Sequence, residues 1–261
     1  MEYTPVDLYY VESGQGTPVV LLHAFPFDHS TWDPVAGLLQ SHYHVIQPDL
    51  RGQGKSPLGA EECSIRLMAE DVAQLMDRLQ IPRAILAGHS MGGYVALAFA
   101  RAYPGRLAGL GLVATRAAAD APETRQKRLV QVRNIKRYGV KTLAKTMLPS
   151  LSDSPEIQAR LKEILLQAPA GGTIAALKAM ADRPDSTDFL HEITVPSVVI
   201  TGENDRLISY ERAETMAQLL GRGWMEKVAG AGHMLTLESP AAVAAAIEQL
   251  AQAVGSRKQE P

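Results

Sequence analysis

The chain has 261 residues, and its 26 basic and 28 acidic side chains give a formal charge of −2. That length suits one or two domains, and the near-neutral charge gives no support for nucleic acid or a strongly anionic surface as a partner. The lone cysteine, Cys63, rules out an intramolecular disulfide, so the fold needs no oxidising compartment.

Short apolar runs that end in turn residues alternate with longer helical patterns, which is typical of a parallel sheet covered by helices. The runs predict strands over residues 6–11, 19–23, 44–47, 84–87, 107–114, 197–201 and 225–228. Apolar side chains at helical spacing predict a helix over residues 64–79. The last helix is predicted to begin at Ser239 and Pro240, an N-cap and a first-turn proline, and to run to about Val254.

The alternation of strands and helices stops between residues 116 and 188. Prolines and a glycine pair divide this stretch into several predicted helices without a strand. An insertion of this length predicts a helical cap over the C-terminal edge of the sheet, where open α/β sheets bind ligands. We therefore predict a core domain of residues 1–115 and 189–256, a cap of residues 116–188 and a disordered tail of residues 257–261.

Neither end of the chain predicts a membrane segment. The alanine-rich stretch 241–254 is interrupted by one glutamate and two glutamines, and it is shorter than the roughly 20 apolar residues of a membrane span. Residues 1–11 contain Glu2 and Asp7, where a signal peptide has a basic start and an apolar core. We expect a cytoplasmic protein with no membrane partner.

The strongest chemical signal is the sequence Gly-His-Ser-Met-Gly-Gly at residues 88–93, between a predicted strand and an apolar helix over residues 92–103. A serine on so sharp a turn needs small neighbours, because the turn brings the backbones of Gly88 and Gly92 close together. The turn exposes the hydroxyl at a helix N-terminus. We predict that Ser90 is a nucleophile; the alternative is a glycine-rich turn that only connects two elements.

A serine hydroxyl is a weak nucleophile unless a base takes its proton. Of the seven histidines, only His233 lies in a loop after the last predicted strand. The glycines before it, Gly230 and Gly232, allow this loop to reach across the sheet edge. We predict that His233 is the base; the alternative is an ordinary surface or packed histidine.

The acid that orients such a histidine should follow a strand that lies between the serine and the histidine in the chain. The sequence Thr-Gly-Glu-Asn-Asp-Arg at residues 201–206 ends a predicted strand and offers two carboxylates. Asp205 lies further along the loop and is the predicted partner of the base; Glu203 is the alternative, and Asp120 is a weaker one. The carboxylate would fix the imidazole tautomer and stabilise the imidazolium without taking the proton.

An early His-Ala-Phe-Pro sequence at residues 23–26 completes a pattern whose other parts are the turn at the serine and the chain order Ser90, Asp205, His233. This pattern resembles the α/β-hydrolase superfamily, and the likeness covers nearly the whole chain except the cap. The resemblance implies an α/β fold, the α/β-hydrolase fold, in which a mostly parallel sheet is flanked by helices and carries an inserted helical cap.

The resemblance also implies an oxyanion hole. In the superfamily a His-Gly-x-Pro loop follows the third strand, and its x residue supplies one backbone N–H. Carried over to this sequence, Phe25 and Met91 would give the two N–H groups that bind the developing oxyanion. Ala24 departs from the usual glycine of that loop.

Residues 48–56 resemble the superfamily's Asp-x-Arg-Gly-x-Gly-x-Ser loop, and we assign them a mainly structural role. Gly54-Lys55-Ser56 superficially suggests a phosphate loop, but that motif needs glycine where Asp49 stands, so no nucleotide site is predicted. Cys63 stands alone and no histidine pair has metal-site spacing beside a carboxylate, so we expect neither a metal nor a cofactor.

Basic residues with few acids nearby mark the predicted cap: Arg125, Lys127, Arg128, Arg133, Lys136, Arg137, Lys141 and Lys145. At helical spacing they most simply form the solvated face of cap helices. The alternative is an electrostatic funnel that concentrates a carboxylate-bearing substrate at low salt. Met147 and Leu148, also in the cap, are candidates for apolar pocket residues, with burial in the core of the cap as the equal alternative.

Within the superfamily, a serine at this turn argues against haloalkane dehalogenases and epoxide hydrolases, which use aspartate there. The overall pattern is most similar to small bacterial carboxylesterases and 3-oxoadipate enol-lactonase-like hydrolases. We expect a serine carboxylesterase that cleaves small-molecule esters through an acyl-enzyme intermediate. Two alternatives stay open: a lactonase or enol-lactonase with the same triad, and a ligand-binding protein without turnover. The sequence predicts no oligomeric state.

Overall fold

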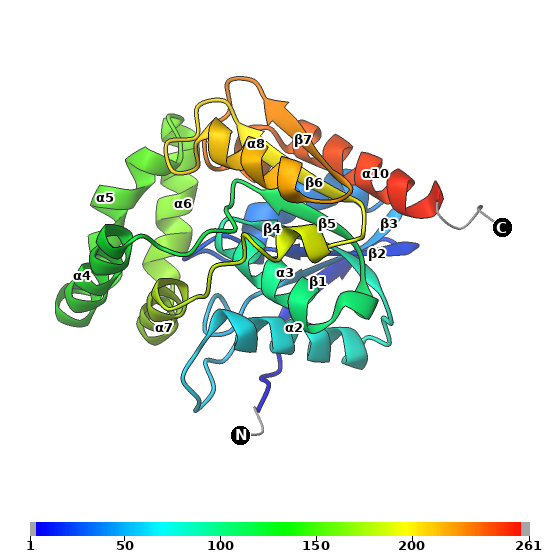
Figure 1. Ribbon diagram of the computed structural model, residues 1–261. Coiled ribbons are helices and arrows are strands. Elements are labelled where there is room, and N and C mark those ends of the chain that lie inside the picture. Colours follow the sequence, from blue (N-terminus) through cyan, green and yellow to red (C-terminus); the bar gives the residue numbers. More distant parts are fainter. Residues whose placement is uncertain (1–3, 257–261) are drawn as a thin grey trace.

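The computed structural model describes residues 4–256, so the predicted tail of residues 257–261 lies outside the described residues. Seven strands form one sheet in the order β1-β3-β2-β4-β5-β6-β7 (Figure 1). Their bounds are β1 Tyr10–Ser13, β2 Thr17–Leu22, β3 Tyr43–Pro48, β4 Ala84–His89, β5 Leu107–Val113, β6 Ser197–Gly202 and β7 Gly223–Val228. β1 runs antiparallel to β3, and all the other neighbours are parallel. The predicted α/β-hydrolase fold class is confirmed.

The first strand begins later than the prediction of residues 6–11. In the segment before β1, backbone N–H groups bind side chains instead of a neighbouring strand. The Val6 N–H donates to Asp71 Oδ1 at 2.8 Å, and the Tyr9 N–H donates to Ser56 Oγ at 2.9 Å. The apolar alternation of this segment therefore reflects packing over a helix and a loop rather than sheet pairing.

Helices cover both faces of the sheet. Successive strand residues point to opposite faces, and since the strands are apolar at successive positions, both faces must be buried. Val19 and Leu21 face α1 (Asp33–Leu39) and α10 (Pro240–Gly255), whereas Val20 and Leu22 face the layer of α2, α3 and α8. The bounds of that layer are α2 Ile65–Arg78, α3 Met91–Ala102 and α8 Tyr210–Leu219. Strands that are apolar on both sides are typical of a parallel sheet buried on both faces.

Local capping sets the helix limits. Ser64 Oγ accepts the Leu67 N–H at 3.0 Å and caps α2 at its N-terminus. α10 begins at Pro240 with Ser239 at the N-cap, as predicted, although the Ser239 side chain makes no capping hydrogen bond. The short helices are α9 (Leu235–Glu238) and 3-10 turns at His29–Trp32, Pro104–Arg106 and Leu190–Glu192.

Four helices fill the chain between β5 and β6, as the insertion predicts: α4 Pro122–Tyr138, α5 Lys141–Leu151, α6 Pro155–Gln167 and α7 Ala170–Ala181. Figure 1 shows them gathered on the left of the sheet. Pro149 lies inside α5 rather than between helices. The domain limits at 115/116 and 188/189 stay a prediction.

The structure gives one finding on membrane crossing. Among the described residues, no single helix is both long and apolar enough to cross a bilayer. α6 and α7 meet the length and composition criteria only as a pair, and the pair is bent by 106° at its junction.

Candidate active site

Ser90 occupies a strained turn between β4 and α3. Its φ of 51° and ψ of −108° are unusual for a residue other than glycine. Glycine is required on both sides: a Cβ on Gly88 would collide with the Gly92 carbonyl, and a Cβ on Gly92 would collide with the Leu22 carbonyl. The Thr115 hydroxyl donates to the Ser90 carbonyl at 2.7 Å and helps to hold the turn.

Three residues that the sequence singles out meet at the C-terminal edge of the sheet. His233 Nε2 lies 3.1 Å from Ser90 Oγ, and His233 Nδ1 lies 2.9 Å from Asp205 Oδ2. The serine follows β4, the aspartate follows β6 and the histidine follows β7, and parallel strands place all three loops at one edge. The His233 and Asp205 side chains are only 3% and 0% exposed, so their contact is shielded from water.

The structure also separates the two carboxylates of the loop after β6. The second oxygen of Asp205 accepts the N–H groups of Leu207 and Ile208 at 2.8 and 3.0 Å. Burial alone would raise the pKa of Asp205, but the hydrogen bonds from the histidine and the backbone hold that pKa below its ordinary value. Glu203 instead pairs with Lys227 Nζ at 2.7 Å on the surface. Asp205 therefore stays ionised beside the imidazole.

Two contacts that sequence reasoning missed hold the backbone of His233. His89 Nε2 donates to the His233 carbonyl at 2.8 Å, and the His233 N–H donates to the Leu151 carbonyl, at the end of α5, at 3.1 Å. Burial lowers the pKa of His89 to about 3, so this ring is neutral near pH 7. The position of His89 beside the serine was its only signal in the sequence.

The two predicted oxyanion donors lie next to the serine. Phe25 lines the same pocket as Ser90 and His233, and its N–H has no acceptor among the described residues. Met91 is the first residue of α3, so its N–H has no acceptor within the helix. Neither N–H has an acceptor among the described residues, and the role of the two groups as oxyanion donors stays a prediction.

A buried histidine fixes the loop that carries Phe25. His23 Nε2 accepts the Leu50 N–H at 2.9 Å, which leaves the ring proton on Nδ1, and Nδ1 donates to the Ala24 carbonyl at 3.0 Å. Burial lowers the pKa of His23, which keeps the ring neutral. Alanine in place of the usual glycine is thus accommodated in a loop with defined hydrogen bonds.

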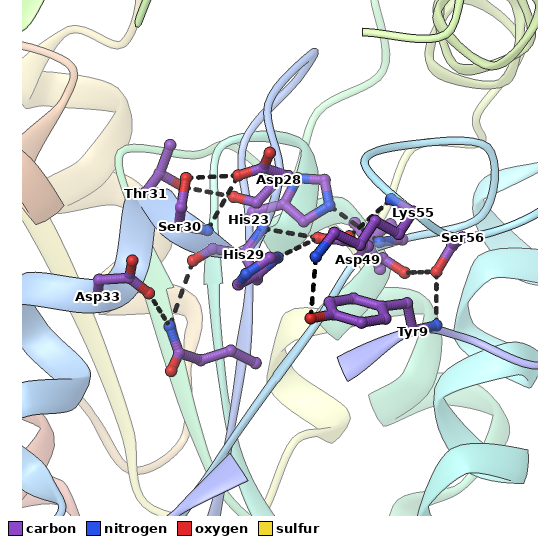
Figure 2. A network of polar contacts seen from close by, with 12 residues as sticks. Tyr9, His23, Asp28, His29, Ser30, Thr31, Asp33, Asp49, Lys55 and Ser56 are labelled. Carbon is purple, nitrogen blue, oxygen red and sulfur yellow. Dashed lines mark hydrogen bonds and ion pairs between the residues drawn. The ribbon is translucent and has the colours of Figure 1, made fainter. Parts of the chain in front are cut away.

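One group of described side chains lies close enough together to hold a metal ion: the ligand atoms of Asp28, His29 and Asp49 all lie within 4.8 Å of one another (Figure 2). These atoms already have partners within the chain. The Asp49 carboxylate accepts hydrogen bonds from His29 Nδ1 at 2.7 Å and from the Lys55 N–H at 2.8 Å. The Asp28 carboxylate accepts hydrogen bonds from the N–H and the hydroxyl of Ser30. The hydrogen bond to Asp49 raises the pKa of His29. These hydrogen bonds give the group a structural role, because they hold the loop of residues 48–56 in place.

Asp120, the weaker candidate for the acid, is held elsewhere. Its carboxylate is fully buried and pairs with Arg116, Arg128 and Arg183 at 2.6, 2.5 and 2.6 Å. Burial alone would raise the pKa of Asp120, but the guanidinium groups of Arg128 and Arg183 lower it to about 2. Asp120 therefore organises arginines at the entrance to the cap and is not a partner of His233.

A pocket of about 470 Å³ opens above Ser90 and His233, with walls from the cap helices α4 and α5 and from the loop after β6. Met147 lines this pocket, as the sequence suggests. Leu148 does not: its side chain is 5% exposed and belongs to the hydrophobic core. Neighbouring residues of a helix point about 100° apart, which explains the different surroundings.

The fold and the sequence are similar to those of known proteins. An esterase structure from Thermogutta terrifontis with malate bound is 37% identical, with a TM-score of 0.92 and coverage of 95% of this chain and 94% of that one. An enol-lactonase structure from Burkholderia xenovorans is 26% identical, with a TM-score of 0.87 and coverage of 95% and 97%. The 3-oxoadipate enol-lactonase 2 of Acinetobacter baylyi is 29% identical over 251 residues, which is 93% of this chain and 92% of that protein.

A family profile described as the alpha/beta hydrolase family matches residues 19–246, which is most of the chain. The match begins in β2 and ends in α10, so it includes every loop that carries a residue of the site. By sequence and by fold, the chain belongs to the alpha/beta hydrolase family.

Proposed function

We propose that the protein is a serine hydrolase that cleaves carboxylic esters, with Ser90 as nucleophile, His233 as general base and Asp205 as the residue that orients the histidine. One observation carries the proposal: a continuous line of hydrogen bonds from Asp205 through His233 to Ser90, at 2.9 and 3.1 Å, at the floor of a pocket. The likeness to an esterase at 37% identity supports the ester class.

In the first half-reaction, His233 Nε2 takes the Ser90 proton while the hydroxyl oxygen attacks the ester carbonyl carbon. The resulting oxyanion accepts hydrogen bonds from the Phe25 and Met91 N–H groups. Collapse of this intermediate breaks the bond to the alcohol, which receives the proton from His233 and leaves an acyl group on the serine.

In the second half-reaction, the same imidazole takes a proton from water, and the hydroxide attacks the acyl carbonyl. The bond to Ser90 Oγ breaks, the serine regains its proton from His233, and the carboxylic acid is released. Asp205 stays ionised throughout and stabilises the imidazolium; the hydrogen bonds that lower its pKa serve this role. The scheme uses no metal and no cofactor.

The substitution Ser90→Ala tests the proposal. We expect turnover of 4-nitrophenyl acetate to fall by a factor on the order of 10⁴–10⁶, with circular dichroism and the melting temperature close to those of the parent. A fluorophosphonate should label the parent at Ser90, as read by mass spectrometry. Residual turnover within tenfold of the parent would contradict the nucleophile assignment. A chain that is not labelled would favour a ligand-binding protein.

A lactonase with the same triad is the second candidate, and the likeness to two enol-lactonases favours it specifically. Opening of a lactone needs the same attack on a carbonyl, but the alcohol stays joined to the acyl group. A panel of nitrophenyl esters of rising chain length, run beside several lactones, separates the two functions through their kcat/KM values.

A further inference from the structure

The pocket above Ser90 has a one-sided charge. Its described lining residues include no Asp or Glu, but they include four cations: Arg116, Lys127, Arg128 and Arg206. Only Arg206 has a one-to-one partner, because it pairs with Asp153 at 2.9 Å. The other three cations face a half-enclosed space next to the reactive serine.

Asp120 fixes the two lining arginines without cancelling their charge. Its single carboxylate binds Arg116, Arg128 and also Arg183, so the cluster keeps two positive charges in excess. Both lining arginines have largely buried side chains, with exposures of 13% and 16%. A guanidinium held in this way is already positioned for a second acceptor, so little conformational entropy is lost when an anion binds.

The arginines also keep unused hydrogen-bond donors. Arg116 Nε is buried and has no acceptor among the described residues, and Arg128 contacts Asp120 only through its own Nε. Arg116 lines the pocket above Ser90 and also two adjoining cavities of about 550 and 280 Å³. Asp120 is bound only by Nη2 of Arg116 and by Nε of Arg128, so both guanidinium groups keep further N–H donors that Asp120 does not use.

Lys127 adds a third cation to the same wall. It lies on α4 one residue before Arg128, its side chain is exposed, and it has no ion pair among the described residues. Of the eight basic residues that mark the cap in the sequence, Lys127 and Arg128 alone line the pocket. The remaining six are exposed and belong to the solvated face of the cap helices. Of these eight residues, therefore, only Lys127 and Arg128 are placed to attract an anion into the pocket.

We propose that the pocket above Ser90 binds an ester or lactone that carries a second, free carboxylate, and that Arg116, Lys127 and Arg128 form the subsite for that carboxylate. The inference rests on the proposed function, because it names the substrate class of the same site. The substrate class is thus the monoanionic ester or lactone of a small dicarboxylic or hydroxy-dicarboxylic acid, with the scissile carbonyl at Ser90 and the free carboxylate against α4.

Matched acid and amide substrates test the subsite. Monoethyl adipate and ethyl adipamate differ only in a terminal carboxylate or carboxamide on the acyl side, and 4-acetoxybenzoate and 4-acetoxybenzamide differ in the same way on the alcohol side. We expect kcat/KM for the acid to exceed that for the amide by roughly tenfold to a hundredfold in at least one pair, as charge-assisted hydrogen bonds would give. The gain should appear mainly in KM.

Variants on α4 assign the effect to the pocket wall. Lys127→Gln should lower the acid-to-amide ratio severalfold, and Lys127→Arg should restore it. Lys136→Gln is the matched control, because Lys136 is an exposed lysine of the same helix that does not line the pocket. Adipate should also inhibit hydrolysis of 4-nitrophenyl acetate competitively, with a higher inhibition constant in Lys127→Gln.

The outcomes separate the two proposals. Ser90-dependent hydrolysis of 4-nitrophenyl acetate, with equal kcat/KM for acid and amide in both pairs, overturns the carboxylate subsite and leaves the proposed function standing. An equal fall of the ratio in Lys136→Gln also overturns the subsite, because the effect would then be general surface charge. Failure of the parent to hydrolyse any ester or lactone overturns the proposed function itself.

Discussion

Each residue of the proposed triad is held in place by hydrogen bonds beyond those that join the triad itself. The Thr115 hydroxyl fixes the carbonyl of Ser90, and His89 and the Leu151 carbonyl fix the backbone of His233. Asp205 is held by two backbone N–H groups of its own loop. Because a serine hydroxyl and an imidazole react only at hydrogen-bond distance, these supports are as much part of the site as the motif residues.

Substitution of the two loop carboxylates tests the proposed acid. Asp205→Asn keeps the shape of the side chain, but its amide can favour the wrong imidazole tautomer, so we expect a loss of about 10⁴-fold in kcat. Glu203→Gln is the control, and it should cost far less because Glu203 pairs with Lys227 on the surface. If Glu203→Gln is the crippling change and Asp205→Asn the mild one, the assignment of the acid is wrong.

The ion pairs of Asp120 predict that the free energy of unfolding decreases at low pH. Its pKa of about 2 in the folded chain lies below the 3.8 of a free aspartate. The Asp120 carboxylate therefore stabilises the folded state fully above pH 4 and loses this contribution as the pH falls through 2. The difference in unfolding free energy between the parent and Asp120→Asn, measured by urea titration, should shrink between pH 4 and pH 2. A difference that does not vary with pH would contradict this role.

At the scale of elements, α5 contributes both to the pocket wall and to the support of His233, the proposed base. Met147 faces the pocket, Leu148 enters the core, and the carbonyl of Leu151 at the end of the helix accepts the His233 N–H. The cap therefore shapes substrate space and positions a residue of the site at the same time. A displacement of α5 would alter chemistry as well as specificity.

Two adjacent residues of α5 should respond differently to truncation. Met147→Ala enlarges the pocket, so we expect the preferred acyl or alcohol chain of nitrophenyl esters to lengthen while stability changes little. Leu148→Ala leaves a core cavity and should lower the unfolding free energy by about 2–5 kcal/mol. Chain-length profiles and urea titrations of both variants check this. The reverse pattern would mean that α5 is rotated in solution.

At the scale of the whole molecule, the pocket wall is positively charged although the chain as a whole is slightly negative. The chain carries a formal charge of −2, yet the pocket wall gathers arginine and lysine. Charges lining a concave surface concentrate an oppositely charged ligand, and salt weakens this effect. A protein that is acidic overall can thus attract a small anion at one place.

Salt dependence follows from the proposed carboxylate subsite. With monoethyl adipate, kcat/KM should fall severalfold as ionic strength rises from about 0.01 to about 0.1 M, because the Debye length shrinks from about 30 to about 10 Å. Ethyl adipamate is neutral and should change little over the same range. Initial rates at subsaturating substrate give both values. Equal salt responses for the two substrates would count against electrostatic attraction by the pocket wall.

The sequence by itself determined the fold class and the chain order of the site residues. Strands that are apolar on both faces, separated by helical spacing, leave few arrangements other than a parallel sheet between helices. The glycines around Ser90 indicated a tight turn, since a Cβ at Gly88 or Gly92 has no room. These signals are local, because backbone conformation and burial depend mostly on a residue and its near neighbours in the chain.

Only the tertiary structure decided which side chains meet. Glu203 and Asp205 are two residues apart, and the sequence could not separate them except by position in a loop, whereas the fold places Asp205 alone against His233. The same holds for Met147 against Leu148 and for the arginines that converge on Asp120. Such contacts join loops and helices that are far apart in the chain. Their geometry depends on how the cap and the sheet pack together, and a short sequence pattern does not contain that information.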